Sequence, residues 1–455
     1  MKDSLHVDQN VAMSAPSQPT PSRPVLDGWR GVVAARDMRI ALPGRALSVL
    51  GDSVTAAVLI LEVTSGGHPE RVTGLLVAFG LPLFVLSGAA GRLVDRHDSR
   101  TLLVRAGLVQ VVASAGLVWS PSYAWTLAFV MVLQCGQAVT GPTWAALLPR
   151  MVGERLVSAA VGLQYSLSAA AAMVGFALGG LLHDLVGTHR ALVLDTMTFL
   201  LLVGVAFLVR TRRHGDVDGI PGARRAAGAA EASPLRSAGG AGIVWRDPVL
   251  RAFVGALLLF IVAAEATNVA EPLLIVGVLG GSGTDYGLVG GAMGAGAVLG
   301  PLLAARFTDD RGRVGANAAA TTTLALGLVA MGRVPSVGVL LPLAAAFGAL
   351  LGLSTALTFA TVTSRTPDQA RGRVLSAVNG WGRGASMLAL LLGGALTGHL
   401  GARTAYLVLG LVAALVGPLL LLARRRIATA ELLEVANGTG CGGRPLGGCP
   451  GTRLA

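Results

Sequence analysis

Acidic side chains occur inside several of the apolar stretches of this sequence, where acids are rare. Asp52 lies within residues 42–64, and Glu265 and Glu271 lie within residues 249–277. A charged side chain in the hydrocarbon of a membrane costs roughly 2.5–3.5 kcal/mol on insertion scales, so it persists where it has a cavity or a partner. Such an acid exchanges a proton more cheaply than it stays charged in a closed, dry site. We therefore predict that Asp52, Glu265 and Glu271 are proton-coupling residues, with a structural hydrogen bond between helices as the alternative.

Polar side chains elsewhere in the apolar stretches follow helical spacing. Two sets have spacings of three, four and three residues: Gln134, Gln137, Gly141 and Trp144, and Ser376, Asn379, Arg383 and Ser386. This spacing returns to one face of a helix, so each set forms a stripe that can bind a small molecule or join helices. Asn268 shares a face with Glu265 and with Pro272, which frees a backbone carbonyl group. The candidate substrate-cavity residues are Gln134, Gln137, Trp144, Asn268, Asn379 and Arg383.

Two charged residues are predicted to meet in the second half of the chain. Arg383 lies about ten residues beyond Arg373, or roughly 15 Å along a helix, and Glu265 lies at a similar depth beyond Arg251. An unpaired arginine at this depth is unfavourable, so a carboxylate partner is expected. We predict that Glu265 and Arg383 approach each other, directly or through substrate, with Glu271 as the reserve partner.

Membrane helices are the elements that must position these side chains. The chain of 455 residues is 53% hydrophobic and 13% charged, with a mean hydropathy of +0.67, which is too apolar for a soluble protein of this size. About 20 apolar residues suffice for one helical crossing of a bilayer. Twelve such stretches occur, at residues 42–64, 72–91, 101–119, 123–146, 156–182, 190–210, 249–277, 285–305, 315–332, 336–362, 374–398 and 402–423. The sequence predicts an all-α membrane protein with twelve transmembrane helices.

The positive charge of the chain is distributed by side. The formal net charge is +12. If the N-terminus is cytoplasmic, most arginines fall in cytoplasmic segments, and the opposite face receives only Arg71, Arg190, Arg333 and Arg403. This asymmetry follows the positive-inside rule and places both termini in the cytoplasm. Nucleic-acid binding is not expected, because no basic cluster alternates with stacking aromatic residues.

Two short basic loops repeat one pattern between apolar stretches. The first is defined by Gly91, Asp95, Arg96 and Arg100, and the second by Asp309, Arg311 and Arg313. Another pair of segments repeats as well, because Arg155-Leu-Val-Ser158-Ala159 aligns with Arg373-Val-Leu-Ser376-Ala377. Shared apolar composition alone does not explain these matches, so the chain is predicted to be a tandem duplication.

The duplicated loops resemble the signature loop of the major facilitator superfamily, whose fold consists of two pseudo-symmetric six-helix bundles. The resemblance implies that both loops gate the transport cycle. In the family, the loop aspartate pairs with basic residues or helix N-termini on the cytoplasmic side and latches the outward-facing state. The candidate partners are Arg371 and Arg373 for Asp95, and Arg150 and Arg155 for Asp309. Asp98 stands where the family often has glycine.

Further motifs resemble the drug and siderophore (enterobactin exporter-like) efflux branch of this superfamily. Gly51-Asp52 resembles a pair in its first helix, and Asp195 resembles a residue of its sixth helix, which we interpret as a buried hydrogen bonder between helices. Its antiporter motif in the fifth helix is matched, with Phe176 in place of a proline, by Gly162, Gly175, Gly179 and Gly180. The resemblance implies proton-coupled efflux of a small organic molecule, such as a drug, siderophore or secondary metabolite, by alternating access and without a cofactor.

Two other functions remain open at this point. The same acids would serve a proton-coupled uptake symporter, and a membrane sensor that does not transport is a third possibility. An enzyme is not expected, because the sequence lacks a Ser/His/Asp set, an HExxH motif and a phosphate-binding Gly-Lys-Ser/Thr loop. No metal site is expected either, since Cys441 and Cys449 have no nearby histidine.

Composition sets the expected domain boundaries. The domains are a flexible cytoplasmic N-terminus at residues 1–39, six-helix bundles at 40–211 and 248–425, a cytoplasmic linker at 212–247 and a disordered cytoplasmic tail at 426–455. We expect a monomer in the cell membrane. Its partners would be a small-molecule substrate, protons and the lipid bilayer.

Overall fold

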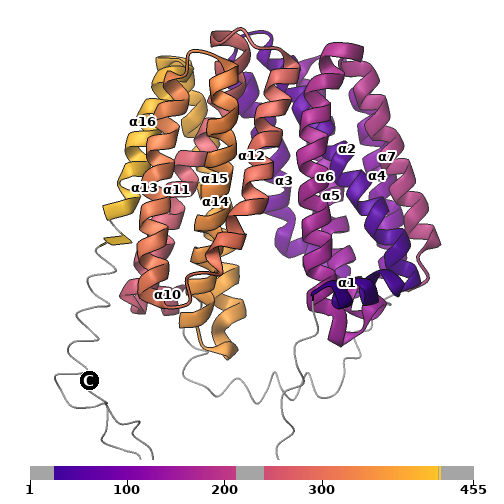
Figure 1. Cartoon of the computed structure of the whole chain (residues 1–455). Helices are drawn as coiled ribbons and strands as arrows, with labels where there is room; N and C mark the ends of the chain where they lie inside the picture. Colours follow the sequence, from indigo (N-terminus) through magenta and orange to yellow (C-terminus); the bar gives the residue numbers. More distant parts are fainter. Residues whose placement is uncertain (1–24, 212–239, 419, 422–455) are drawn as a thin grey trace, which may run out of the picture.

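The computed structural model describes residues 25–211, 240–418 and 420–421 as an array of long helices (Figure 1). Those of the first half are α2 (Arg36–Thr64), α3 (Pro69–Arg96), α4 (Ser99–Val118), α5 (Tyr123–Val152), α6 (Val157–Val186) and α7 (Thr188–Leu208). Those of the second half are α11 (Pro248–Pro272), continued by the π-helical η3 (Leu273–Val278), and α12 (Gly283–Ala304), α13 (Asp310–Arg333), α14 (Val337–Arg365), α15 (Asp368–Leu400) and α16 (Ala402–Ala414). Each of the twelve predicted stretches coincides with one of these helices, which confirms the all-α membrane fold.

Length and apolar composition qualify most of these helices as membrane spans. Ten helices of the described part are long and apolar enough to cross a bilayer, and Ala402–Pro418 is a shorter apolar helix. The long helix α15 is outside this set. It carries Asn379, Arg383 and several glycines in its middle, which lower its hydropathy. Composition thus sets α15 apart from the ten qualifying helices.

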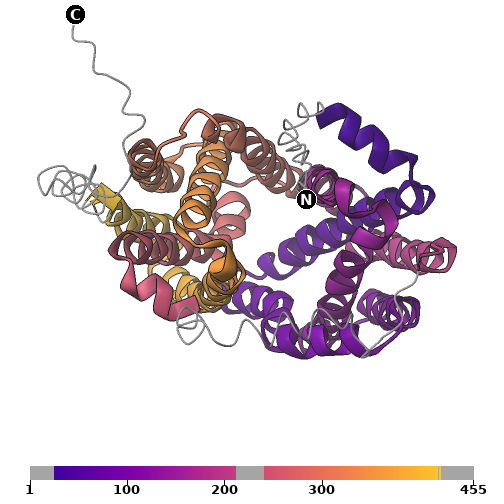
Figure 2. The ribbon, with the colours of Figure 1, turned by 90° about the horizontal axis from the view of Figure 1, so that it is seen from below.

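The two halves of the chain lie side by side and pack internally in the same way (Figures 1 and 2). In the first half α6 packs on α2, and in the second α15 packs on α11. A Cβ atom added at Gly175 of α6 would meet the Leu50 carbonyl oxygen, and one added at Gly393 would meet the Ala266 carbonyl oxygen. Gly175 and Gly393 are related by the same offset that aligns Arg155 with Arg373, so the sequence repeat aligns them as well. Small residues therefore allow equivalent close helix contacts in both halves.

Contacts between the halves lie toward the end of the molecule opposite the short helices α1 (Val25–Ala34) and α10 (Gly240–Arg246) (Figure 1). There α6 packs on α12 and α3 packs on α15. A Cβ atom added at Gly287 would lie 2.8 Å from the Ala177 carbonyl oxygen, and one added at Gly394 would meet Thr73. Phe176, which replaces the proline of the resembled motif, packs against Tyr286 of α12 with ring centroids 5.3 Å apart.

Two expected irregular segments contain helix. Residues 25–34, expected within a flexible N-terminus, form α1, and residues 240–246, expected within the linker, form α10. The helix α1 packs on α6 because its apolar face, centred on Val32, meets an apolar cluster. Local polarity had suggested flexibility, but tertiary burial supplies the stabilisation. Residues 1–24, 212–239 and the predicted tail at 426–455 lie outside the described residues.

The two duplicated loops differ in how they start the following helix. Asp309 caps α13 by accepting a hydrogen bond from the Gly312 amide at 2.8 Å. In the first loop the cap of α4 is Asp98, which accepts from the Thr101 amide at 3.0 Å, whereas Asp95 lies in the last turn of α3. The sequence repeat aligns Asp95 with Asp309, but capping makes Asp98 the local equivalent. Asp98 has φ of −61°, so this turn needs no glycine.

Candidate functional site

A polar cluster in the first half joins α2 to α5. Gln137 of α5 donates a hydrogen bond from Nε2 to Asp52 Oδ2 of α2. About two helical turns toward the α1 end, the Arg45 guanidinium lies over the Trp144 ring, 5.7 Å from its centroid. Both pairs are seven residues apart on their helices, and the helices are antiparallel, so the contacts form two successive rungs. The structure thereby brings together the predicted residues Asp52, Gln137 and Trp144.

Arg45 interacts electrostatically with Asp52, but one polar atom of each residue has no hydrogen-bond partner among the described residues. Three buried atoms of this cluster have no hydrogen-bond partner among the described residues: Arg45 Nε, Asp52 Oδ1 and Trp144 Nε1. The Trp144 side chain is 2% exposed. Buried polar groups are normally paired, and orphaned ones concentrate at sites that hold water, ions or ligands. The cluster therefore offers two N–H donors and one acidic acceptor to a small molecule or a proton.

Asp195 of α7 lies next to this cluster and makes further hydrogen bonds there. It accepts hydrogen bonds from Thr55 of α2 at 2.7 Å and from Thr198 at 3.1 Å. The bond from Thr55 confirms the interpretation of Asp195 as a buried hydrogen bonder between helices. Asp195 also lies close enough to Asp52 for the two carboxylates to repel each other when both are charged. This repulsion makes the charge of Asp52 sensitive to its surroundings.

Gly51 allows α7 to approach α2 at the cluster. A Cβ atom at Gly51 would collide with Asp195 Oδ1 and Thr198 Oγ1, whereas one at Gly204 would meet nothing within 4 Å. We expect Gly51→Ala to reduce stability by about 1–3 kcal/mol, as overpacking does, and Gly204→Ala to leave it nearly unchanged. Thermal unfolding of both variants in the same detergent measures the difference. Equal melting temperatures would show that the α2–α7 contact tolerates the extra methyl group.

The predicted ion pair of the second half is absent in its direct form. Glu265 accepts a hydrogen bond from Asn268 Nδ2 at 2.8 Å on its own helix. Arg383 donates instead to the Leu83 carbonyl oxygen of α3 at 3.2 Å, across the boundary between the halves. No hydrogen bond or ion pair joins Glu265 to Arg383 in the described part of the chain. Similar depth in the membrane did not determine which way each side chain points.

Glu271 lies in a separate buried cluster of the second half. It is 8% exposed and interacts electrostatically with the phenol groups of Tyr286 and Tyr406, both of which are also buried. Tyr286 in turn contacts Phe176 of the first half. Glu271 thus lies near the α6–α12 contact and apart from Asp52, which is half-buried within the first half.

The remaining predicted residues are dispersed. Gln134 is partly buried and Asn379 is exposed, and neither side chain makes a hydrogen bond within the described residues. Arg100 donates to the Phe207 carbonyl oxygen, and Arg313 donates to the Phe307 carbonyl oxygen at 3.1 Å and to Ser364 at 3.3 Å. Of the other loop residues, Asp95 and Arg96 are exposed and Gly91 is partly buried. The side chain of Arg311 lies outside the described part of the chain.

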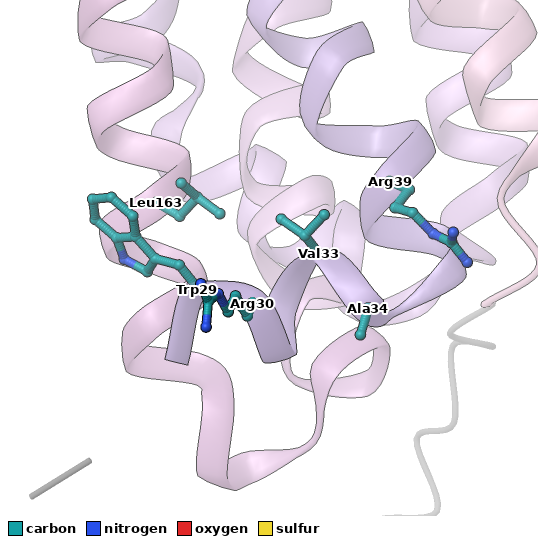
Figure 3. Close-up of a pocket in the computed structure, with 6 residues that line it drawn as sticks. All are labelled: Trp29, Arg30, Val33, Ala34, Arg39 and Leu163. Carbon is teal, nitrogen blue, oxygen red and sulfur yellow. The ribbon is translucent and has the colours of Figure 1, made fainter. Parts of the chain in front are cut away.

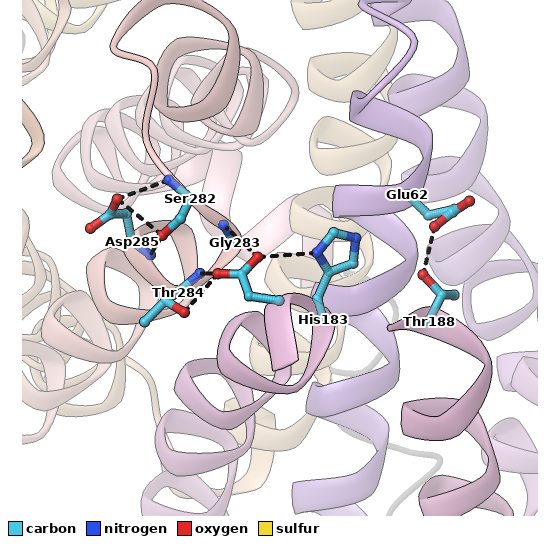
Figure 4. Close-up of polar contacts among 8 residues, drawn as sticks. Glu62, His183, Thr188, Ser282, Gly283, Thr284 and Asp285 are labelled. Atoms are coloured by element: carbon cyan, nitrogen blue, oxygen red, sulfur yellow. Dashed lines mark hydrogen bonds and ion pairs between the residues drawn. The ribbon is translucent and has the colours of Figure 1, made fainter. Parts of the chain in front are cut away.

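A carboxylate joins the two halves at the end opposite α1 and α10. Asp184 of α6 accepts hydrogen bonds from the Gly283 amide at 3.1 Å, the Thr284 amide at 2.6 Å and the Thr284 hydroxyl at 2.7 Å (Figure 4). These amides open α12 and have no partners within their own helix. The carboxylate also meets the positive end of the helix dipole. Asp184 therefore bridges the two halves through a helix N-terminus.

Sequence reasoning missed both Arg45 and Asp184. Arg45 was grouped with the cytoplasmic arginines, although its spacing of seven residues from Asp52 places both on one helix face. That spacing was a usable signal. Asp184 had none, because its partners lie 99 and 100 residues away in the chain.

Comparisons with known proteins agree with this geometry. A family model described as transmembrane secretion effector matches residues 45–437. The uncharacterized MFS-type transporter YfiS of Bacillus subtilis is 24% identical over 415 residues, which cover 88% of this chain and 96% of that protein. Macrolide efflux protein A of Streptococcus pyogenes is 25% identical over 179 residues, which cover 38% of this chain and only 44% of that protein.

Solved structures share the fold at low sequence identity. A POT family transporter in complex with a thioalcohol-conjugated peptide has a TM-score of 0.67 and 11% identity, covering 88% of this chain and 99% of that one. The nucleoside transporter NupG has a TM-score of 0.65 and 10% identity, covering 84% and 99%. Because the family model spans most of the sequence, the chain belongs to the transmembrane secretion effector family of the major facilitator superfamily and is a multi-pass membrane transporter, not an enzyme.

Proposed function

We propose that this transporter exports a small organic molecule in exchange for protons, with both chain termini in the cytoplasm. The observation that carries the proposal is the half-buried carboxyl group of Asp52. It accepts a hydrogen bond from Gln137, interacts electrostatically with Arg45 and keeps one buried oxygen atom without a hydrogen-bond partner among the described residues. Inside a membrane protein such a group exchanges a proton at lower cost than it stays charged in a dry site. Asp52 is thus the proposed proton carrier.

Protonation of Asp52 changes what the site can bind. While Asp52 is charged, it attracts the Arg45 guanidinium, and its Oδ1 atom, which has no hydrogen-bond partner among the described residues, can bind a donor or cationic group of a substrate. Once Asp52 is protonated, it no longer attracts such a group. Proton and substrate then compete for one carboxylate, which is the requirement for exchange.

Export is favoured over uptake by the partial relatives, and the conformation is compatible with it. The partial relatives from Streptococcus pyogenes are macrolide efflux proteins. In addition, the contacts between the halves close the end opposite α1 and α10. In the proposed topology that end is extracellular, so the closed contacts leave the cytoplasmic side as the route for loading. An importer visits this conformation as well, so the conformation identifies the loading route of an exporter but does not choose between export and uptake.

Other groups have proposed roles within this cycle. Glu265 and Glu271 are further candidates for proton exchange, and Asp95 and Asp309 remain candidates for gating at the cytoplasmic ends. A macrolide is the first substrate to test, and a siderophore is the second. The protein would act in the cell membrane.

Transport by purified protein in proteoliposomes tests the proposal. With wild-type protein and an imposed pH gradient, we expect a labelled macrolide to accumulate inside vesicles whose lumen is more acidic than the exterior. Protons then leave as substrate enters, which is exchange. Accumulation only when the exterior is more acidic would indicate a symporter. If the protein changes the flux of no compound in a panel, a membrane sensor would be favoured instead.

A further inference from the structure

Helix α15 turns one face toward α3 of the first half. Met387 and Gly394 share this face, because they are seven residues, or about two helical turns, apart. A Cβ atom added at Gly80 of α3 would meet the Met387 side chain, and one added at Gly394 would meet Thr73. Packing of the two halves therefore covers this face toward the end opposite α1 and α10.

The same face of α15 is exposed on the side of Met387 that leads toward α10. Arg383 lies one helical turn before Met387, and the residues that precede Arg383 on this face are also polar. The exposed polar residues are Ser376, Asn379 and Arg383. On α3, Phe84 lies one turn beyond Gly80 and is 40% exposed. The packing of α3 on α15 thus ends near Arg383 and leaves polar side chains of α15 accessible.

The exposed side of Arg383 is not the side that lipid covers. Leu388 is 53% exposed and Leu392 is 40% exposed. They lie five and nine residues beyond Arg383, which places them on the opposite side of the helix. These leucines form an apolar surface that suits contact with lipid, whereas Arg383 points toward the first half of the molecule.

Arg383 lies at the depth of the membrane core. It donates a hydrogen bond to the carbonyl oxygen of Leu83, which belongs to the candidate membrane span Pro69–Leu86. A Cβ atom added at Gly382 would lie 3.5 Å from Cδ1 of Ile261, inside the candidate span Leu250–Val278. A cationic side chain at this depth is costly, and such residues mark the routes of substrates and ions.

Arg383 has no carboxylate partner among the described residues. The Leu83 carbonyl oxygen is the only acceptor that its guanidinium meets there, so most of its five N–H donors are available. Glu265 of α11 is hydrogen-bonded on its own helix. The nearest acid in sequence on α15 is Asp368, fifteen residues or about 22 Å of helix away. Asp95 of α3 lies twelve residues, or about 18 Å, beyond Leu83.

We propose that Arg383 binds an anionic group of the transported molecule, with the Asn379 amide as a second donor, so that the substrate is an organic anion such as a carboxylate. A guanidinium matches a carboxylate through two parallel hydrogen bonds. The bound anion competes with the Leu83 carbonyl group for the guanidinium, so binding weakens a contact that joins the halves. This inference rests on the proposed transport of a small organic molecule but does not require proton coupling at Asp52.

Thiol labelling at Ser376 tests the charge of this face. The full-length protein, with its three native cysteines replaced by serine, carries Ser376→Cys and is reacted in detergent with an anionic or a cationic methanethiosulfonate reagent. We expect the ratio of anionic to cationic rate constants to fall by about threefold or more when Arg383→Gln is added, because the nearby positive charge is lost. Arg383→Lys should keep the ratio. An unchanged ratio in Arg383→Gln, or no reaction of Ser376→Cys with either reagent, would overturn the proposal.

Protection by a bound anion tests recognition itself. We expect 2-naphthoate to slow the reaction of Ser376→Cys with the neutral reagent N-ethylmaleimide, and the uncharged 2-naphthamide to have no effect. Arg383→Gln should abolish the protection. Absence of protection by 2-naphthoate, equal protection by both compounds, or protection that survives in Arg383→Gln would each contradict an anion site. Neither measurement uses a proton gradient, so the result is independent of whether proton exchange is found.

Val33→Cys is the control for local action. Val33 is 45% exposed on α1, where it lines a separate pocket together with Trp29, Arg39 and Leu163 (Figure 3). We expect Arg383→Gln to leave the ratio of rate constants at Val33→Cys unchanged, and 2-naphthoate to give no protection there. If the ratio fell equally at Val33→Cys and Ser376→Cys, the change would not report a local charge and the proposal would be lost.

Discussion

Asp52→Asn is expected to abolish substrate accumulation driven by a pH gradient while leaving downhill flux measurable. Asparagine has nearly the same shape and can still accept the hydrogen bond that Gln137 donates to this position. It cannot bind or release a proton in the working pH range, so transport can no longer be linked to proton movement. We expect accumulation to fall at least tenfold in the proteoliposome assay. The matched control is Glu70→Gln, because Glu70 is an exposed acid whose side chain is 71% accessible.

The stability of the same variant tests its pairing with Arg45. Asp52→Asn leaves the half-buried Arg45 guanidinium without the opposite charge that it interacts with, and a charge that loses its partner in a poorly solvated site destabilises the folded state. Thermal stability should therefore fall. Adding Arg45→Gln should restore part of it without restoring coupling, because the unpaired charge is gone but the proton carrier is still missing. Additive losses of stability in the double variant would mean that the two charges do not interact.

Hydropathy and the internal repeat predicted the fold because both patterns can be read from the sequence alone. Each apolar stretch became one helix, and the aligned residues Gly175 and Gly393 make equivalent contacts in the two halves. The exceptions are short. Helix α1 forms because Val32 is buried against α6, and such tertiary stabilisation has no signature in the polarity of the segment alone.

The part of the candidate site that depends on which residues share one helix face was predicted from the sequence. Spacing placed Gln137 and Trp144 on one face of α5, and the structure brings both to α2. It could not fix the rotation of one helix against another. Glu265 instead accepts a hydrogen bond from Asn268 on its own helix, and Arg383 donates one to the Leu83 carbonyl group. Arg45 was missed because charge counting assigns an arginine near a helix end to the solvent.

The second large effect is expected from Asp184, the carboxylate that joins α6 to the start of α12. Its bonds to two backbone amides and one hydroxyl exist only while the halves are closed at this end. Hydrogen bonds to a charged group contribute about 1.5–3 kcal/mol. Asp184→Ala should thus shift the equilibrium between conformations toward opening at this end by roughly tenfold or more, since about 1.4 kcal/mol is a factor of ten.

Distances between spin labels at Trp119→Cys and Leu400→Cys, both exposed and near this end in different halves, report the opening. The control is Asp285→Asn, which removes a carboxylate from the same helix N-terminus. Asp285 accepts from the Ser282 amide at 2.8 Å within one half, so its loss weakens the cap of α12 without releasing the other half. We expect longer distances in Asp184→Ala and unchanged ones in Asp285→Asn. Equal distributions in both variants would mean that the packing of α6 on α12 through Gly180 and Gly287 closes this end without help from the carboxylate.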